Sequence, residues 1–156
     1  MSIKATPTDE PRSVDTGEFT ILPESGGDIR DGAYSSRALS LAKEFRLAGL
    51  SFSFHNTPDR VFEQRAADWL GPTLLFASSA YSQNPEIFSL ILTIIKKHIE
   101  KLYSDAEKAK IKLQFTIKQN KSSRSTHVEY EGDSKSFPEL LSTLEKICES
   151  YNSEKK

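Results

Sequence analysis

The sequence predicts an α+β domain in which helices pack on a small, mostly antiparallel sheet. Three observations predict this fold. A long apolar helix pattern occupies residues 84–103, two alternating segments follow it, and an amphipathic helix pattern comes near the end of the chain. A chain of 156 residues is long enough to bury such a core as one domain without disulfides. We expect that single domain to span residues 18–151.

The two ends of the chain are polar. Residues 1–17 are rich in Pro, Thr, Asp and Glu, and they hold too few apolar side chains to offset the entropy of ordering. We predict a disordered tail over residues 1–17 and a short polar tail over residues 152–156.

Residues 18–22 read EFTIL and predict a short strand, and residues 23–28 predict a turn in which Gly26 and Gly27 adopt positive φ. A phosphate-binding loop is the alternative for the two glycines. The sequence lacks both GxGxxG and GxxxxGK[ST] there, which favours the turn.

An amphipathic helix is predicted over residues 35–48, ended by Gly49, because apolar residues recur at helical spacing: Ala38, Leu41, Ala42 and Phe45. Residues 50–55 alternate and predict a strand. A second helix is predicted from Pro58 to a stop at Gly71-Pro72, with four buried side chains: Val61, Phe62, Ala66 and Trp69. Residues 73–81 predict a further apolar helix packed against the central one.

The central helix, residues 84–103, has a clear start, since Asn84 can cap it, Pro85 suits its first turn and Glu86 faces its positive end. Its first half is apolar on nearly every side and is predicted to be buried, whereas the second half carries lysines and should reach solvent. A membrane span is the alternative. The apolar stretch is interrupted by Gly71-Pro72, by several serines and by Asn84-Pro85, so we predict a soluble core helix and no membrane.

A C-terminal β-hairpin is predicted next, because residues 110–118 alternate strictly and residues 126–131 form a second alternating segment. Its outer face should place Lys112 and Lys118 opposite Glu129 and Glu131. A capping box of Ser136 and Glu139 then predicts a helix with an apolar stripe: Leu140, Leu141, Leu144, Ile147, Cys148 and Tyr151.

Charge is distributed unevenly along a chain whose net charge is only -1. Residues 96–124 hold nine basic and three acidic side chains, which is typical of a surface for an anionic partner. The basic hairpin region, residues 108–124, therefore supplies the candidate nucleic-acid contacts, Lys110, Lys112, Lys118, Lys121 and Arg124. The loop at its tip has no aromatic residue for base stacking, so a solvated hairpin tip is the competing interpretation.

No motif in the sequence indicates catalysis. The histidines, His55, His98 and His127, lack partners at metal-ligand spacing, and Cys148 lies on an apolar helix stripe as expected for a buried, inert thiol. We predict no metal, no cofactor and no small-molecule substrate. An enzyme site assembled from distant residues is the alternative, with His55 and His127 as its members. The single cysteine and the absence of an apolar signal region predict a cytoplasmic protein.

Four segments of the C-terminal half occur in the order NPEIFSLILTII, IKLQFTI, HVEYEG and LLSTLEKI. In this order they resemble small helix-strand-strand-helix accessory modules encoded beside effectors in bacterial defence clusters. The resemblance implies an interaction or adaptor role and carries over no site residue. We therefore predict a non-enzymatic interaction subunit that binds a protein partner or forms a homo-oligomer, accessory to a bacterial defence or conflict system. A nucleic-acid-binding module is the alternative.

Overall fold

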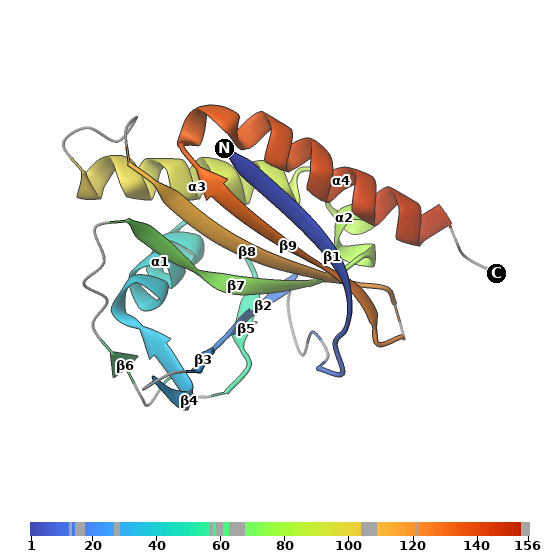
Figure 1. Ribbon diagram of the computed structural model, residues 1–156, viewed down its shortest axis with the longest axis horizontal. Helices are drawn as coiled ribbons and strands as arrows, with labels where there is room; N and C mark the ends of the chain where they lie inside the picture. The colour runs from blue at the N-terminus through green and yellow to red at the C-terminus, as the bar shows by residue number, and fades with distance from the viewer. Residues whose placement is uncertain are drawn as a thin grey trace.

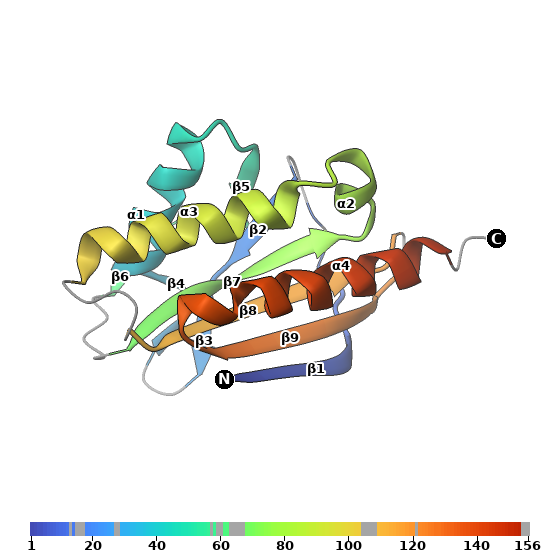
Figure 2. The ribbon, with the colours of Figure 1, turned by 90° about the horizontal axis from the view of Figure 1, so that it is seen from above.

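A six-stranded mixed sheet organises the computed structural model, and three long helices lie on one of its faces (Figures 1 and 2). The structure describes residues 1–12, 14, 18–26, 29–56, 58, 61–62, 68–103, 109–120 and 122–153. The strands are β1 (Ser2–Asp9), β2 (Phe19–Leu22), β3 (Glu24–Gly26), β4 (Ile29–Ser35), β5 (Phe52–Phe54), β6 (Val61–Phe62), β7 (Trp69–Ala77), β8 (Ile111–Lys118) and β9 (Arg124–Gly132). The helices are α1 (Ser36–Leu47), α2 (Ser79–Gln83), α3 (Ile87–Leu102) and α4 (Phe137–Ser153), and a short 3-10 helix, Ser134–Ser136, precedes α4.

The main sheet has the strand order β1-β9-β8-β7-β2-β5. Antiparallel pairs join β1 to β9, β9 to β8 and β7 to β2, whereas β7 and β8 run parallel, as do β2 and β5. The parallel pair β7 and β8 is connected through α2 and α3, since parallel neighbours need a long crossover. A smaller sheet of β3, β4 and β6 lies beside the main one. The α+β class and the mostly antiparallel sheet are confirmed.

The core lies between the sheet and the helices. Side chains aligned across the strands, Ile21, Leu74, Phe115 and Val128, are all buried on the helix side. Aromatic rings connect the layers, with Phe76 of β7 4.8 Å from Phe88 of α3 and Phe19 of β2 5.3 Å from Phe45 of α1, measured between centroids. The described helices therefore cover one face of the sheet, and none of them lies on the other.

Predictions based on strong periodicity are confirmed. Helix α1 begins after Ser35, whose Oγ accepts from Ala38 N–H, and Gly49 has φ of 82° at its end. Strands β8 and β9 form the predicted hairpin, followed by α4. The central helix is confirmed as α3, although the structure assigns its N-cap to Glu86 instead of Asn84, and Leu90 and Leu102 are exposed.

Residues 58–81 were predicted to be two helices, and this prediction is wrong. Val61–Phe62 is a strand and Trp69–Ala77 is the long strand β7, and among the described residues of this range helix occurs only in Ser79–Gln83; residues 59–60 and 63–67 lie outside the described part of the chain. Strand β7 is buried on both faces, since Leu74, Leu75 and Phe76 are each at most 1% exposed. A strand buried on both faces shows a continuous apolar run instead of alternation, which is why it resembled a buried helix.

The polar segments also contain regular structure. Ser2–Asp9 pairs with β9, so the predicted disorder of residues 1–17 is wrong for this stretch, although residues 13 and 15–17 are not described. The predicted turn at residues 23–28 is partly a strand, β3, and Gly27 and Asp28 lie outside the described residues. Helix α4 continues to Ser153, where the predicted tail was to have begun at residue 152. No helix in the described part of the chain is long and apolar enough to cross a membrane.

Candidate interaction surface

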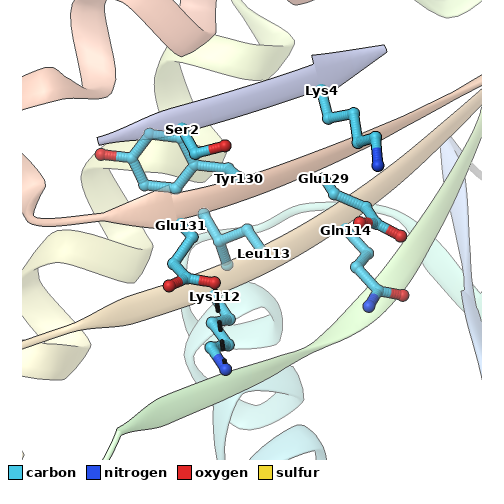
Figure 3. A pocket seen from close by; sticks show the side chains of 8 residues that line it. All are labelled: Ser2, Lys4, Lys112, Leu113, Gln114, Glu129, Tyr130 and Glu131. Atoms are coloured by element: carbon cyan, nitrogen blue, oxygen red, sulfur yellow. Dashed lines mark ion pairs between the residues drawn. The ribbon is translucent and has the colours of Figure 1, made fainter. Parts of the chain in front are cut away.

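The helix-free side of strands β1, β9 and β8 forms a polar surface that we call the open face. Its side chains alternate with those of the core: Ser2, Lys4, Thr6 and Thr8 from β1; Ser125, His127, Glu129 and Glu131 from β9; and Lys112, Gln114, Thr116 and Lys118 from β8. A hollow of about 270 Å³ lies at one end, where Lys4, Lys112, Gln114, Glu129 and Glu131 meet (Figure 3). None of these open-face residues is Phe, Tyr or Trp.

Two of the candidate nucleic-acid contacts share one carboxylate on this face. Lys110 Nζ lies 2.7 Å and Lys112 Nζ 3.9 Å from Glu131 oxygens. The hydrogen bond between Lys110 and Glu131 raises the pKa of the lysine and lowers the pKa of the glutamate. The predicted cross-strand pairing of Lys112 with Glu131 is confirmed, and Glu131 offsets one of the two lysine charges.

Lys118 lies at the other end of β8 and contacts backbone instead of an acid. Its Nζ donates to the carbonyl of Arg12 at 2.8 Å, so the segment after β1 crosses this end of the open face. The predicted pairing of Lys118 with Glu129 or Glu131 is wrong, because the register places Ser125 opposite it. The crossing segment is fixed by the ion pair between Arg12 Nε and Glu10 Oε1, 2.7 Å long.

A second hollow, of about 220 Å³, lies where the crossing segment meets the sheet, lined by residues that include Thr73, Thr116 and His127. His127 Nδ1 lies 3.0 Å from Thr116 Oγ1, and its Nε2 lies 3.6 Å from Glu129 Oε1. His55, the other residue of the hypothetical enzyme site, follows β5. Strands β2, β7 and β8 separate it from β9, a distance of about 19 Å at ordinary strand spacing. The two histidines are not brought together.

The remaining candidate contacts lie near the hairpin tip. The guanidinium of Arg124 is 5.6 Å from the centre of the Tyr151 ring of α4, and Lys121 is outside the described residues. The four described candidates therefore divide between the two ends of β8 and do not form one basic patch. Among the described residues, no group of three His, Cys, Asp or Glu side chains could hold a metal ion.

Cys148 and His98 are buried in the core. Burial raises the pKa of the Cys148 thiol to about 12, as expected for the predicted buried cysteine. His98 is 4% exposed, and burial lowers its pKa, opposed by Glu44 at 4.0 Å and reinforced by Lys101. Neither His98 ring nitrogen has a hydrogen-bond partner, and neither does Trp69 Nε1 nearby. The position of His98 on a helix face was predicted. Its burial against Trp69 was not, because it depends on strand β7, which the sequence did not reveal.

Sequence reasoning missed the outer edge of β1. Glu10 N–H donates to the Ser123 carbonyl at 2.7 Å and extends the β1–β9 register, so even-numbered residues of β1 bond to β9. A second bond, from Gln119 N–H to the Arg124 carbonyl at 2.9 Å, agrees with this. It shows that the even-numbered residues of β9 direct their backbone groups to β8, so the odd-numbered residues of β9 direct theirs to β1. The odd-numbered residues of β1 therefore point their backbone groups outward: Ile3, Ala5, Pro7 and Asp9.

Comparisons of the chain with protein-family models, with curated proteins and with solved structures each found no match.

Proposed function

We propose that this chain is a non-enzymatic protein-binding subunit that presents the open face of its main sheet to a protein partner. The observation that carries the proposal is the charge pattern of that face. Lys4, Lys112, Glu129 and Glu131 lie within one hollow, so both signs of charge are interspersed (Figure 3). A mixed pattern suits a protein surface of complementary pattern, whereas a nucleic-acid backbone requires a surface of one sign.

The nucleic-acid alternative has less support from these contacts. Glu131 offsets one of the two charges of Lys110 and Lys112, and Lys118 donates to the Arg12 carbonyl. The open-face residues of β1, β8 and β9 include no Phe, Tyr or Trp on which a base could stack. The resemblance of the C-terminal half to accessory modules of bacterial defence clusters extends the proposal to an adaptor role beside such an effector.

The test expresses the chain in the organism it comes from and identifies the proteins that co-purify with it. The open-face variant combines Lys4→Glu with Glu129→Lys, two residues that lie opposite each other in the β1–β9 register, so the net charge is unchanged. The control combines Lys97→Glu with Glu100→Lys, both exposed on α3. We expect a stoichiometric partner whose affinity falls at least about tenfold in the open-face variant, because like charges then face each other across the interface.

Three outcomes would contradict this proposal. The first is the absence of any stoichiometric partner, and the second is a partner that both variants retain equally. The third is tight binding of short oligonucleotides with an affinity that falls steeply with salt, which would favour the nucleic-acid alternative instead.

A further inference from the structure

The two edges of the main sheet differ in how they are protected. Strand β5, at one edge, has only three residues, and the guanidinium of Arg46 lies 5.3 Å from the Phe52 ring and 5.8 Å from the Phe54 ring. Strand β1, at the other edge, has eight residues and no second neighbour among the described residues. Short strands and charged side chains discourage edge-to-edge pairing. The long edge is protected less, because it has eight residues and because its charged residues Lys4 and Asp9 and its Pro7 still leave a register that opposes no like charges.

The outer edge of β1 offers backbone donors and acceptors in a regular row. Ile3 and Ala5 each direct an N–H and a C=O outward, and Pro7 directs a C=O. Pro7 occurs at a position where its missing N–H costs no bond to β9. On the helix side of the same edge, Ile3 is half-buried while Ala5 and Pro7 are exposed, which leaves an apolar strip beside the outward backbone groups.

We propose that β1 pairs antiparallel with β1 of a second copy of this chain, about a two-fold axis through Ala5. Ala5 then lies opposite Ala5 of the second copy, and Ile3 opposite its Pro7. This register makes about four backbone hydrogen bonds, because each Ala5 both donates and accepts and each Ile3 N–H donates to a Pro7 carbonyl. The apolar side chains of the two strips face one another.

Neighbouring registers fit less well. An axis through Lys4 places Lys4 directly opposite Lys4 of the second copy, and like charges directly opposite are destabilising. An axis through Thr6 places Ile3 opposite Asp9. The register about Ala5 instead sets Lys4 opposite Thr6 on the open face, with no like charges opposed.

Such a dimer joins the two main sheets into one and keeps the helices of both copies on the same side. The two open faces then lie next to each other and could engage a partner bivalently, which raises its apparent affinity. The pairing uses the edge of the sheet and the proposed function uses its face, so either can fail without the other.

The first test is sedimentation of the full chain from about 1 μM to about 1 mM, a range that includes the dissociation constants of small interfaces. Ala5→Pro removes an outward N–H that no strand of the described residues pairs with, and Ala5→Val adds similar bulk but keeps the N–H. We expect a dimer whose dissociation constant rises at least about tenfold in Ala5→Pro and much less in Ala5→Val. Circular dichroism and the melting midpoint should show that both variants are folded.

The second test reads the register by cross-linking. Paired residues directly opposite each other lie about 5.5 Å apart between Cα atoms, within the range of a disulfide. Ala5→Cys should therefore form a covalent dimer with oxidised glutathione, which accepts the electrons and protons of the two thiols. Pro7→Cys should not, because its counterpart is about 14 Å away along the strands. The native Cys148 is buried and does not compete.

A wild-type chain that stays monomeric over the whole range would overturn the proposal, and so would a dimer indifferent to Ala5→Pro. Faster cross-linking of Pro7→Cys than of Ala5→Cys would overturn the register. A monomeric chain that still binds a foreign protein through Lys4 and Glu129 would refute self-pairing and leave the proposed function intact.

Discussion

Gly71 gives a direct test of the strand β7 that replaces the predicted helices. A Cβ atom at this position would lie 2.7 Å from Trp69 Cζ3 and 2.9 Å from Leu113 Cδ2. Trp69 is fully buried and Leu113 is 2% exposed, so neither can move away freely. Overpacking of this kind costs about 1 to 3 kcal/mol, while alanine restricts the unfolded chain and recovers about 0.4 to 1 kcal/mol. The difference spans about 0 to 2.6 kcal/mol, and because two contacts with buried side chains would be shorter than 3.0 Å, we expect Gly71→Ala to destabilise the protein by about 1 to 2 kcal/mol within that range.

Denaturant unfolding measures this free energy, and the melting midpoint should fall by about 2 to 8 °C for a chain of this length. The control is the same substitution in a Trp69→Phe background, which removes both of the closest indole atoms. Gly71→Ala should cost less there, since the contact is shared by the two residues. An alanine that is neutral or stabilising in the wild type would refute the packing of β7, because that is the result expected at the end of a solvated helix.

Three further predictions concern stability, each measured as the free energy of unfolding. Ile91→Ala, at a fully buried site of α3, should cost about 2 to 5 kcal/mol, whereas Leu90→Ala, at a site that is 41% exposed, should cost clearly less. Equal costs would contradict the orientation of α3, which buries Ile91 and exposes Leu90. Because burial lowers the pKa of His98, the unfolded chain binds its proton more readily, so stability should fall as the pH drops below about 6.5. Between pH 7.5 and 5.5 that loss should be up to about 1 kcal/mol larger in the wild type than in His98→Leu, and identical slopes would contradict it. Ser35→Ala should cost about 1 kcal/mol by removing the cap on Ala38 N–H, and Ser35→Thr should restore most of it.

Sequence reasoning succeeded where one face of an element is buried and the other is solvated. Helix α3 and the β8–β9 hairpin show this pattern, since Ile111, Leu113, Phe115 and Ile117 are buried and the residues between them include Lys112 and Gln114 at the surface. Alternation and helical spacing then report the structure directly.

Prediction from the sequence failed where both faces of a strand have the same environment. Strand β7 is apolar except at Thr73, because Leu75, on the side away from the helices, is as buried as Phe76. Strand β1 has only Ile3, Ala5 and Pro7 as apolar residues, and both of its faces are largely exposed. Its order comes from backbone pairing with β9, and three small or isolated apolar residues are too weak a pattern to predict that pairing. The outer edge that supports the proposed dimer could not be recognised before that pairing was known.

The candidate contacts show a similar limit. The sequence correctly placed Lys110, Lys112, Lys118 and Arg124 on or beside the hairpin. Their net charge suggested an anionic partner because the charges were counted over residues 96–124. Glu131, which pairs with Lys110 and Lys112, lies outside that segment in the acidic C-terminal part of the chain. The register between neighbouring strands decides which charged side chains form ion pairs. A count of charges along the chain gives no information about that register.

Lysine acetylation of the chain, alone and in complex with its co-purified partner, tests the proposed function most directly. Lys4 and Lys112 lie on the open face, while Lys96 and Lys97 are exposed on α3 and serve as internal controls. The proposal predicts that the partner slows the modification of Lys4 and Lys112 at least about tenfold and leaves Lys96 and Lys97 unchanged. Protection of Lys96 and Lys97 with continued modification of Lys4 and Lys112 would show that the partner binds the helices and would contradict the open face as the binding surface.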